Sequence, residues 1–335
     1  MNILFELSKE HTTLPKAEVL ACLQAEGIKY SILEATEDVL IIRTDVGNHL
    51  IHRLGERLSF TFYIDELLFS CFNSPDDIKK YAKDVFIDKK GSIAINYKNR
   101  SENIDSRSIV KILAEIYTKN TPVNLTNPDV EVRALITDGK VYVGIKIAEV
   151  DRSLFEKRKV QYRPFFSPIS LHPKLARALV NLSLIKKDET MLDPFCGTGG
   201  ILLEAGLIGA KIVGSDIEAK MIEGCTKTLD SYKIKNYNLF CSDIGDINKY
   251  NVDIDAVVSD LPYGKSTTTK GEHLEQLYKR TFENICNVLK KGRRAVVGLS
   301  NKDMVSIGEH YFSLLEVHEL RVHRSLTRYF AVFQK

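Results

Sequence analysis

Three acidic residues follow three apolar segments in the C-terminal half of the chain. Asp193 follows Met191-Leu192, Asp216 ends the next segment 23 residues later, and Asp243 follows a third. A carboxylate at the first position suits an ammonium group and would repel a diphosphate. The second acid can accept hydrogen bonds from both ribose hydroxyls, and the third can accept one from an adenine amino group. The acids together predict one extended ligand that joins adenosine to an amino acid, although a helix N-cap is the favoured alternative for Asp243 alone.

The glycine-rich segment Asp193–Gly200 (DPFCGTGG) predicts the turn that holds this ligand. Gly197 and Gly199 allow a tight turn and a close approach of the backbone. A dinucleotide site would instead show G-x-G-x-x-G, with the pyrophosphate at the amino end of a helix. The predicted ligand contacts are the three acids, these two glycines, and Phe195, Cys196, Ile217, Ile244 and Pro168.

A fourth apolar segment, 254–259, runs into Asp260-Leu261-Pro262-Tyr263-Gly264. This loop resembles the (D/N)-P-P-(Y/F) loop of methyltransferases that modify the amino nitrogens of nucleic-acid bases. The lone pair of such an amine is delocalised into the ring, so the nitrogen is a poor nucleophile. Asp260 and the carbonyl of Leu261 or Pro262 can accept its two N–H bonds, which localises the lone pair toward the methyl group. Tyr263 can stack on a base taken out of its helix.

The predicted catalytic residues are therefore Asp260, Pro262 and Tyr263, with proline keeping the loop rigid. Leu261 departs from the common pattern, which has proline there, but it still offers a backbone carbonyl. The structural alternative is a plain turn with a packed tyrosine.

Further motifs narrow the resemblance. Phe166-Ser167-Pro168 with Leu171–Leu182 (LHPKLARALVNL), the loop at 260–268 (DLPYGKSTT) and His323–Arg328 (HRSLTR) resemble segments of the tRNA guanine-N2 methyltransferases. In the N-terminal half, NPDVEV at 127–132 and VYVG at 141–144 resemble a THUMP domain, an RNA-binding module of tRNA-modifying enzymes. Over nearly its whole length the chain resembles the archaeal-type tRNA guanosine-10 N2-methyltransferases, which include dimethylating members.

The resemblance implies S-adenosyl-L-methionine as cofactor, tRNA as partner, and methylation of a guanosine N2 amine, expected at position 10, once or twice. Three alternatives stay open: a THUMP methyltransferase acting on an acceptor-stem guanosine, an adenine-N6 enzyme, and a catalytically silent tRNA-binding subunit. The late motif at 323–328 favours guanine N2, and intact Asp193, Asp216, Asp260 and Tyr263 argue against a silent subunit. A monomer is expected, and a small activating protein subunit is left open.

Positive charge is concentrated in the C-terminal part. Residues 1–150 carry 19 Lys and Arg against 22 Asp and Glu, whereas residues 151–335 carry 28 against 22. Such a distribution is expected of a surface that meets a polyanion, with a solvated charge run as the alternative. The predicted RNA contacts are Arg158, Lys159, Arg163, Lys265, Arg324 and Arg328.

Strands and helices must alternate to bring these loops together. From about residue 170 the pattern predicts an α/β, Rossmann-like, doubly wound sheet. Its expected strands are 190–193, 211–216, 238–242, 254–260 and 294–300, with helices at 171–183, 200–208 and 219–232 and an antiparallel pair at 314–322 and 329–334.

The N-terminal half predicts two smaller α+β domains. A β-α-β-β-α-β order suggests a ferredoxin-like domain over 1–72, and a THUMP RNA-binding domain is expected over 73–150. Residues 151–166, polar and basic, are expected to form a linker to the methyltransferase domain at 167–335.

Several protein classes are excluded. No run of 18 apolar residues predicts a membrane span, and the start does not resemble a signal peptide. Six cysteines occur singly, without a C-x-x-C pair, which argues against zinc or a disulfide framework. We therefore expect a cytoplasmic protein with mostly free thiols and no metal.

Overall fold

The computed structural model describes every residue except 89, 167–169, 264–271 and 324–325. The predictions made for Pro168, Lys265 and Arg324 therefore lie outside the described residues. The chain forms two compact units. The first comprises Met1–Thr12, Ile28–Glu56 and Thr61–Asp151, and the second comprises Thr13–Gly27, Arg57–Phe60 and Arg152–Lys335.

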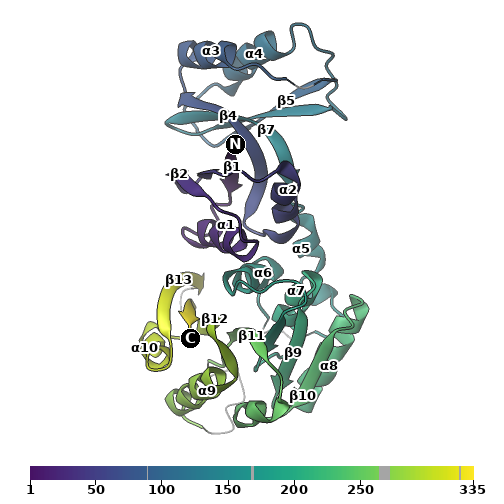
Figure 1. The fold of residues 1–335 in the computed structure, drawn as a ribbon, viewed down its shortest axis with the longest axis vertical. Helices are drawn as coiled ribbons and strands as arrows, with labels where there is room; N and C mark the ends of the chain where they lie inside the picture. Colours follow the sequence, from purple (N-terminus) through teal and green to yellow (C-terminus); the bar gives the residue numbers. More distant parts are fainter. Residues whose placement is uncertain (89, 167–169, 264–271, 324–325) are drawn as a thin grey trace. The chain divides into compact units, whose positions relative to one another are not determined.

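The first unit contains one seven-stranded sheet in the order β2-β3-β1-β4-β7-β6-β5 (Figure 1). Its long strand β4 pairs with β1 on one side and with β7 on the other, so the sheet continues through the expected boundary at residue 72. The subdivision there stays a prediction. The strands are β1 Asn2–Leu7, β2 Ser31–Ala35, β3 Val39–Arg43, β4 Thr61–Phe72, β5 Ile93–Asn99, β6 Val130–Ile136 and β7 Lys140–Glu149, and the helices are α2 Asn48–Arg57, α3 Pro75–Asp84 and α4 Ser106–Tyr117.

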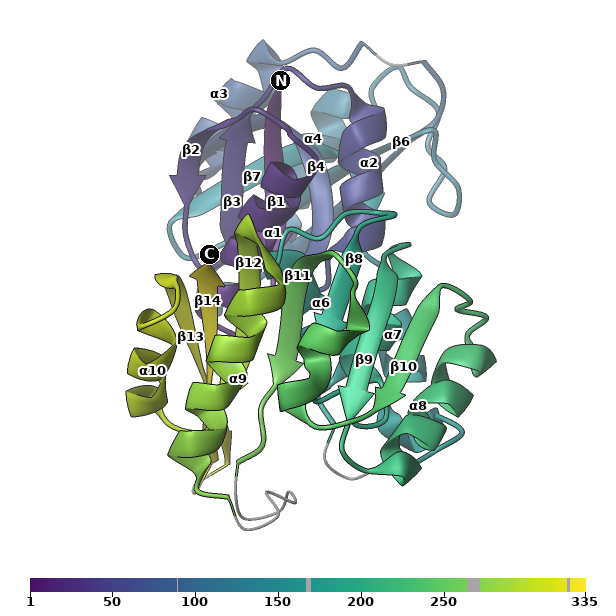
Figure 2. The same ribbon diagram turned by 60° about the horizontal axis from the view of Figure 1, so that its bottom comes forward.

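The second unit contains the predicted doubly wound sheet, in the order β10-β9-β8-β11-β12-β14-β13 (Figure 2). The first five strands are parallel, and β14 is antiparallel to both its neighbours, which confirms the expected final pair. The order reverses between β8 and β11, where a crevice opens at the carboxyl ends of parallel strands. The strands are β8 Thr190–Asp193, β9 Lys211–Asp216, β10 Tyr237–Cys241, β11 Ile254–Asp260, β12 Leu289–Leu299, β13 Ser313–His323 and β14 Leu326–Gln334.

Helices cover both faces of this sheet. Along β11, Ala256 and Val258 pack into one apolar cluster with residues of α6, α7 and α8, whereas Val257 packs into the other with residues of α9 and α10. A strand that is apolar on both faces is the expected sequence for a parallel sheet covered by helices on both sides. The helices are α6 Pro173–Leu182, α7 Gly200–Leu207, α8 Ala219–Ser231, α9 Leu274–Val288 and α10 Val305–Glu309.

Helix α1 (Leu14–Ala25) belongs to this second unit, although it lies near the start of the chain. Its apolar residues pack in the same cluster as those of α6. The carboxylate of Glu18, fully buried, accepts hydrogen bonds from the Ser59 amide and hydroxyl at 3.0 and 2.6 Å, the Phe60 amide at 2.9 Å and the Asn181 side chain at 2.8 Å. These bonds tie α1 and the segment Arg57–Phe60 to α6.

The segment predicted as a linker is a folded part of the second unit. It forms the short helix α5 (Ser153–Lys157) and a 3₁₀ turn at Val160–Tyr162, and the ring of Phe155 is buried. Among the described residues, no helix is long and apolar enough to cross a membrane.

Candidate active site

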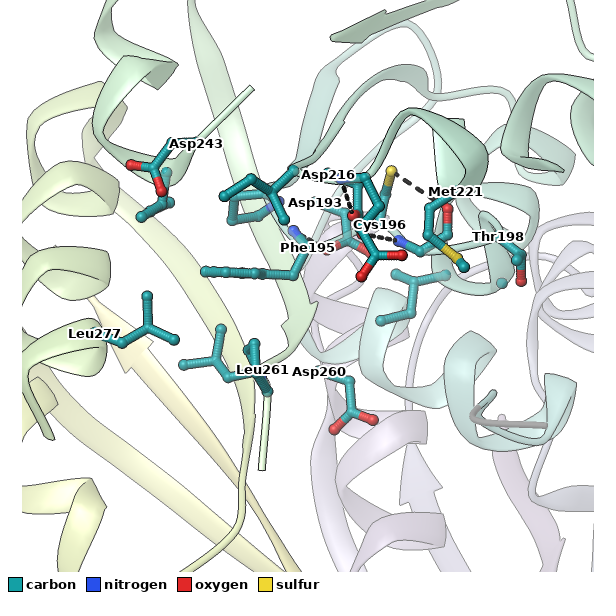
Figure 3. Close-up of a pocket in the computed structure, with 18 of the residues that line it drawn as sticks. Asp193, Phe195, Cys196, Thr198, Asp216, Met221, Asp243, Asp260, Leu261 and Leu277 are labelled. Atoms are coloured by element: carbon teal, nitrogen blue, oxygen red, sulfur yellow. Dashed lines mark hydrogen bonds between the residues drawn. The ribbon is translucent and has the colours of Figure 1, made fainter. Parts of the chain in front are cut away.

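A cavity of about 590 Å³ opens at the carboxyl ends of β8, β9 and β11. This volume is in the range of small-molecule sites, and its position is the switch point of the sheet. Of the described residues predicted to bind the ligand or act in catalysis, all except Gly199 line it. Figure 3 shows Asp193, Asp216 and Cys196 together at one wall, with Asp260 and Leu261 at another. The loops that the sequence singled out therefore meet in one place.

The two glycines of the loop after β8 serve different purposes. Gly197 has φ +50, and its amide donates to Asp216 Oδ2 at 3.0 Å. Gly199 has φ +81, and a Cβ built there would lie 2.6 Å from the sulfur of Cys225. Both positions therefore favour glycine. Gly199 lets the start of α7 pack against α8 and does not line the cavity.

Asp193 is buried and fixes the turn that it opens. Its Oδ1 accepts hydrogen bonds from the Ser259 hydroxyl at 2.6 Å and from the Phe195 amide at 3.2 Å. Burial raises the pKa of Asp193 to about 7, against the effect of these bonds. A cationic group in the cavity would favour the ionised form of Asp193. The contact with an ammonium group therefore has a physical basis, and it stays a prediction.

Asp216 is held by backbone donors at the end of β9. Besides the Gly197 bond to Oδ2, its Oδ1 accepts from the Glu218 amide at 2.9 Å. Burial raises the pKa of Asp216, and these amides oppose the rise. The carboxylate is thereby oriented at the cavity wall, as the ribose prediction requires.

Asp243 caps the 3₁₀ turn at 244–250, accepting from the Gly245 amide at 2.8 Å, so the N-cap alternative is confirmed for this acid. It also lines the cavity and forms an ion pair with Arg280, whose Nη2 lies 2.7 Å from Glu272 Oε2. Partial burial works against ionisation, but the hydrogen bond from Arg280 lowers the pKa of Asp243. Arg280 was not predicted, because nothing in the helical pattern of α9 distinguishes an arginine that faces a cavity, and Glu272, which precedes α9, stands in no motif.

Asp260 ends β11 and is largely buried. Its Oδ1 accepts a hydrogen bond from the Tyr263 hydroxyl, and Arg328 Nη1 lies 3.6 Å from Oδ2. The Arg328 guanidinium also faces the Tyr263 ring, 5.2 Å from its centroid. Burial raises the pKa of Asp260, opposed by Arg328 and by the Tyr263 hydroxyl. Gly298 on β12 was not predicted, yet a Cβ there would collide with the Asp260 carboxylate.

The backbone of this loop is fixed from two sides. The Leu261 amide donates to the Gly298 carbonyl at 3.0 Å, and the Tyr278 hydroxyl donates to the Pro262 carbonyl at 2.8 Å. Because the Pro262 carbonyl already accepts this bond, the Leu261 carbonyl is the better candidate for the second N–H bond of an amine. The rigidity predicted from proline thus has a second source in Tyr278.

Three of the arginines predicted to contact RNA have buried or largely buried side chains, and their RNA contacts stay predictions. Arg158 is buried and donates from Nε and Nη2 to the two oxygens of Glu204, at 2.8 and 3.0 Å. Arg163 is also buried, and Arg328 faces Asp260. Lys159, partly exposed and paired with Glu156, remains a predicted RNA contact.

The described residues contain no cluster of three or more His, Cys, Asp or Glu side chains that could hold a metal ion. Their cysteines are free thiols.

Two family models match the chain. The model described as RMKL-like, methyltransferase domain matches residues 160–329, and the model described as THUMP domain matches residues 75–146. The two matches cover the C-terminal sheet and the later part of the first unit.

Two curated proteins are similar to the chain over their full length, both named tRNA (guanine(10)-N2)-dimethyltransferase. The protein from Methanothermobacter thermautotrophicus is 33% identical and covers 100% of both chains, and that from Methanocaldococcus jannaschii is 31% identical and covers 99% of both. Among solved structures, TrmN from Thermus thermophilus covers 100% of both chains with a TM-score of 0.57 and 17% identity, a likeness of fold.

Proposed function

The chain belongs to the family of S-adenosylmethionine-dependent tRNA guanine-N2 methyltransferases, and we propose that it methylates the exocyclic amine of guanosine 10 in tRNA, once or twice. The observation that carries the proposal is that the Asp260–Tyr263 loop and the three strand-end acids line one cavity. An amine gripped by this loop would therefore face a cofactor held by the acids.

The charges of the cavity fit this cofactor. The lining residues include six acids, whereas Arg280 is the one lining Lys or Arg among the described residues. S-adenosylmethionine carries a sulfonium and an ammonium against one carboxylate, so it is a net cation. A phosphorylated cofactor would be repelled by the same lining. The lining acids are Asp193, Asp216, Glu218, Asp243, Asp260 and Glu272.

We assign Asp216 to the ribose hydroxyls, Asp243 to the adenine end and Asp193 to the ammonium. When bound, the cofactor supplies an electrophilic methyl group on its sulfonium. The residues of the loop prepare the nitrogen: the Asp260 carboxylate and the Leu261 carbonyl accept the two N–H bonds and localise the lone pair. Since burial raises the pKa of Asp260, its carboxylate is also a better proton acceptor than an exposed one when the amine loses a proton.

Tyr263 covers part of this carboxylate. Its hydroxyl donates to Asp260 Oδ1, one of the two oxygens that could accept a hydrogen bond from an incoming amine. Displacement of the hydroxyl frees the carboxylate and leaves the ring beside the entering base, where it can stack.

The THUMP match in the first unit supports tRNA as the substrate that this unit recognises. A tRNA substrate also supports the expected cytoplasmic location. The activating subunit and the monomeric state stay predictions.

The test is nucleoside mass spectrometry of an unmodified tRNA transcript after incubation with enzyme and S-adenosylmethionine. We expect N2-methylguanosine and N2,N2-dimethylguanosine, mapped to position 10. A transcript with inosine at position 10 lacks only the exocyclic amine and should gain no methyl group there. Methylation of adenosine, or of an acceptor-stem guanosine with position 10 unmodified, would refute the proposal in favour of one of the alternatives.

A further inference from the structure

Arg328 lies beside the catalytic loop because of the pairing of three strands. Gly298 on β12 pairs with Asp260 on β11 and with Phe330 on β14. Phe330 packs in the same apolar cluster as Val258, which stands two residues before Asp260. Side chains two residues apart on a strand share a face, so Arg328 and Asp260 project from one face of the sheet. Gly298 stands between their strands and has no side chain to separate them.

The Arg328 guanidinium is largely buried, and its hydrogen bonds are incomplete. Only 12% of its side chain is exposed, and its Nη1 lies 3.6 Å from Asp260 Oδ2, which is too long for a hydrogen bond. Nε is the only one of its nitrogens that is fully buried without a hydrogen-bond partner among the described residues. The terminal nitrogens therefore remain open to an acceptor that enters beside Asp260, and a cation in such surroundings calls for one.

Asp260 and Arg328 together offer two acceptors followed by one donor. Oδ1 of Asp260 is the oxygen that now accepts from the Tyr263 hydroxyl, and Oδ2 is the one that faces Arg328. The Watson–Crick edge of guanine presents the complementary order, which is the N2 amine, N1–H and the acceptor O6. Adenine offers one donor and one acceptor along this edge, so it can match only two of the three groups. A base taken out of its helix is read along this edge.

We infer that Arg328 selects guanine by donating from Nη1 to O6, while Asp260 accepts from N1–H through Oδ2 and from the N2 amine through Oδ1. The Leu261 carbonyl accepts the other N–H bond of the amine, as assigned above. A phosphate is a poorer occupant, because its charge would lie against the Asp260 carboxylate. The inference rests on the proposed function, since it needs a guanine in the cavity, and it adds the residue that recognises this base.

The experiment changes one atom of the base. Two tRNA transcripts carry guanosine or 6-thioguanosine at position 10, and the second keeps the N2 amine and N1–H but has sulfur, a weak acceptor, in place of O6. Wild type should methylate the guanosine transcript with a kcat/KM roughly ten- to a hundredfold higher, the range for a hydrogen bond from a charged donor. In Arg328→Met the two transcripts should give nearly equal kcat/KM, because the contact with O6 is already absent. A change in the ionisation of Asp260 acts on both transcripts and cancels from the ratio.

Arg321→Met, the same substitution at an exposed position of β13, is the control and should keep the wild-type ratio. Calorimetry with S-adenosylhomocysteine shows whether each variant is folded. If Arg328→Met is not, Arg328→Lys, which keeps a donor, provides the second measurement, with a ratio below that of wild type. A wild-type ratio near one, or an undiminished ratio in Arg328→Met, would overturn the inference. If wild type methylates neither transcript at position 10, the proposed function fails and the inference fails with it.

Discussion

The two walls of the cavity hold their carboxylates in different ways. At the wall formed by β8 and β9, Asp193 and Asp216 accept hydrogen bonds from backbone amides of the adjoining loops, and Asp193 also accepts one from the fully buried Ser259 hydroxyl. At the β11 wall, Asp260 is contacted by two side chains, those of Tyr263 and Arg328. Backbone donors are fixed by the fold, whereas side chains can rotate. The difference indicates that the β8–β9 wall, which is assigned to the cofactor, is organised before binding. The β11 wall, which is assigned to the base, rearranges when the substrate enters.

The largest effect should come from Asp260→Ala. The variant loses the charged acceptor at the reacting amine, so kcat should fall by roughly a hundredfold or more. Affinity for S-adenosylhomocysteine should stay unchanged, because this wall does not hold the adenosine. Single-turnover methylation of tRNA and calorimetry measure the two quantities. If the variant turned over at the wild-type rate, Asp260 would not be a catalytic residue.

Asp216→Ala should act on the other wall. Loss of charged hydrogen bonds to the ribose should weaken cofactor binding by roughly ten- to a hundredfold. Turnover at saturating cofactor should change much less. Asp216→Asn, which keeps one acceptor oxygen, should have a cofactor affinity between those of the wild type and the Ala variant. Calorimetric affinity equal to wild type would contradict the strand-end assignment.

Arg328→Met should change the pH dependence of catalysis. Active Asp260 is ionised, and burial already raises its pKa, so activity falls as pH drops through that value. Without the Arg328 cation the pKa rises further, which moves the acid limb of kcat to higher pH. The loss should be greatest in acidic buffer, up to roughly fivefold for about 1 kcal/mol of lost ion pairing, and it should shrink in alkaline buffer. An equal loss at every pH would mean that Arg328 only supports the loop.

The smallest effect concerns Asp193. Burial raises its pKa to about 7, so the carboxylate is largely protonated at pH 6 and ionised at pH 8. An ammonium ligand pairs with the ionised form, so affinity for S-adenosylhomocysteine should increase by roughly two- to fivefold between these pH values. Asp193→Asn should show no such dependence. If the affinity of the wild type did not change with pH, Asp193 would not be the residue that pairs with the ammonium.

The main residues that line the cavity could be predicted from the sequence because they stand in short contiguous motifs. Each predicted acid ends or follows a strand, and parallel strands bring their carboxyl ends to one edge, so the apolar segments alone place Asp193, Asp216 and Asp260 together. Arg280 and Gly298 could not be predicted in this way. Their importance arises from contacts across the fold, and neither stands in a motif.

The burial of side chains in the basic segment could not be predicted from the sequence. Arg158 and Arg163 lie in this segment, which is typical of an RNA-binding surface, yet both side chains are buried, and Arg158 pairs with the distant Glu204. Helix α1 has an apolar face that predicts packing but does not identify the partner. Only the structure shows that this partner is α6, with Glu18 as the buried acceptor.

The place of α1 has a consequence for how the chain is made. During synthesis α1 emerges early, but its partner α6 begins at Pro173, more than a hundred residues later. Until then the apolar face of α1 has no native surface to cover it, and the nascent chain depends on contacts of high sequence separation, which form slowly. The second unit can be completed only after the first unit's strands have left the ribosome. Any fragment that starts after α1, even one retaining every cofactor and catalytic residue, would expose part of its own core.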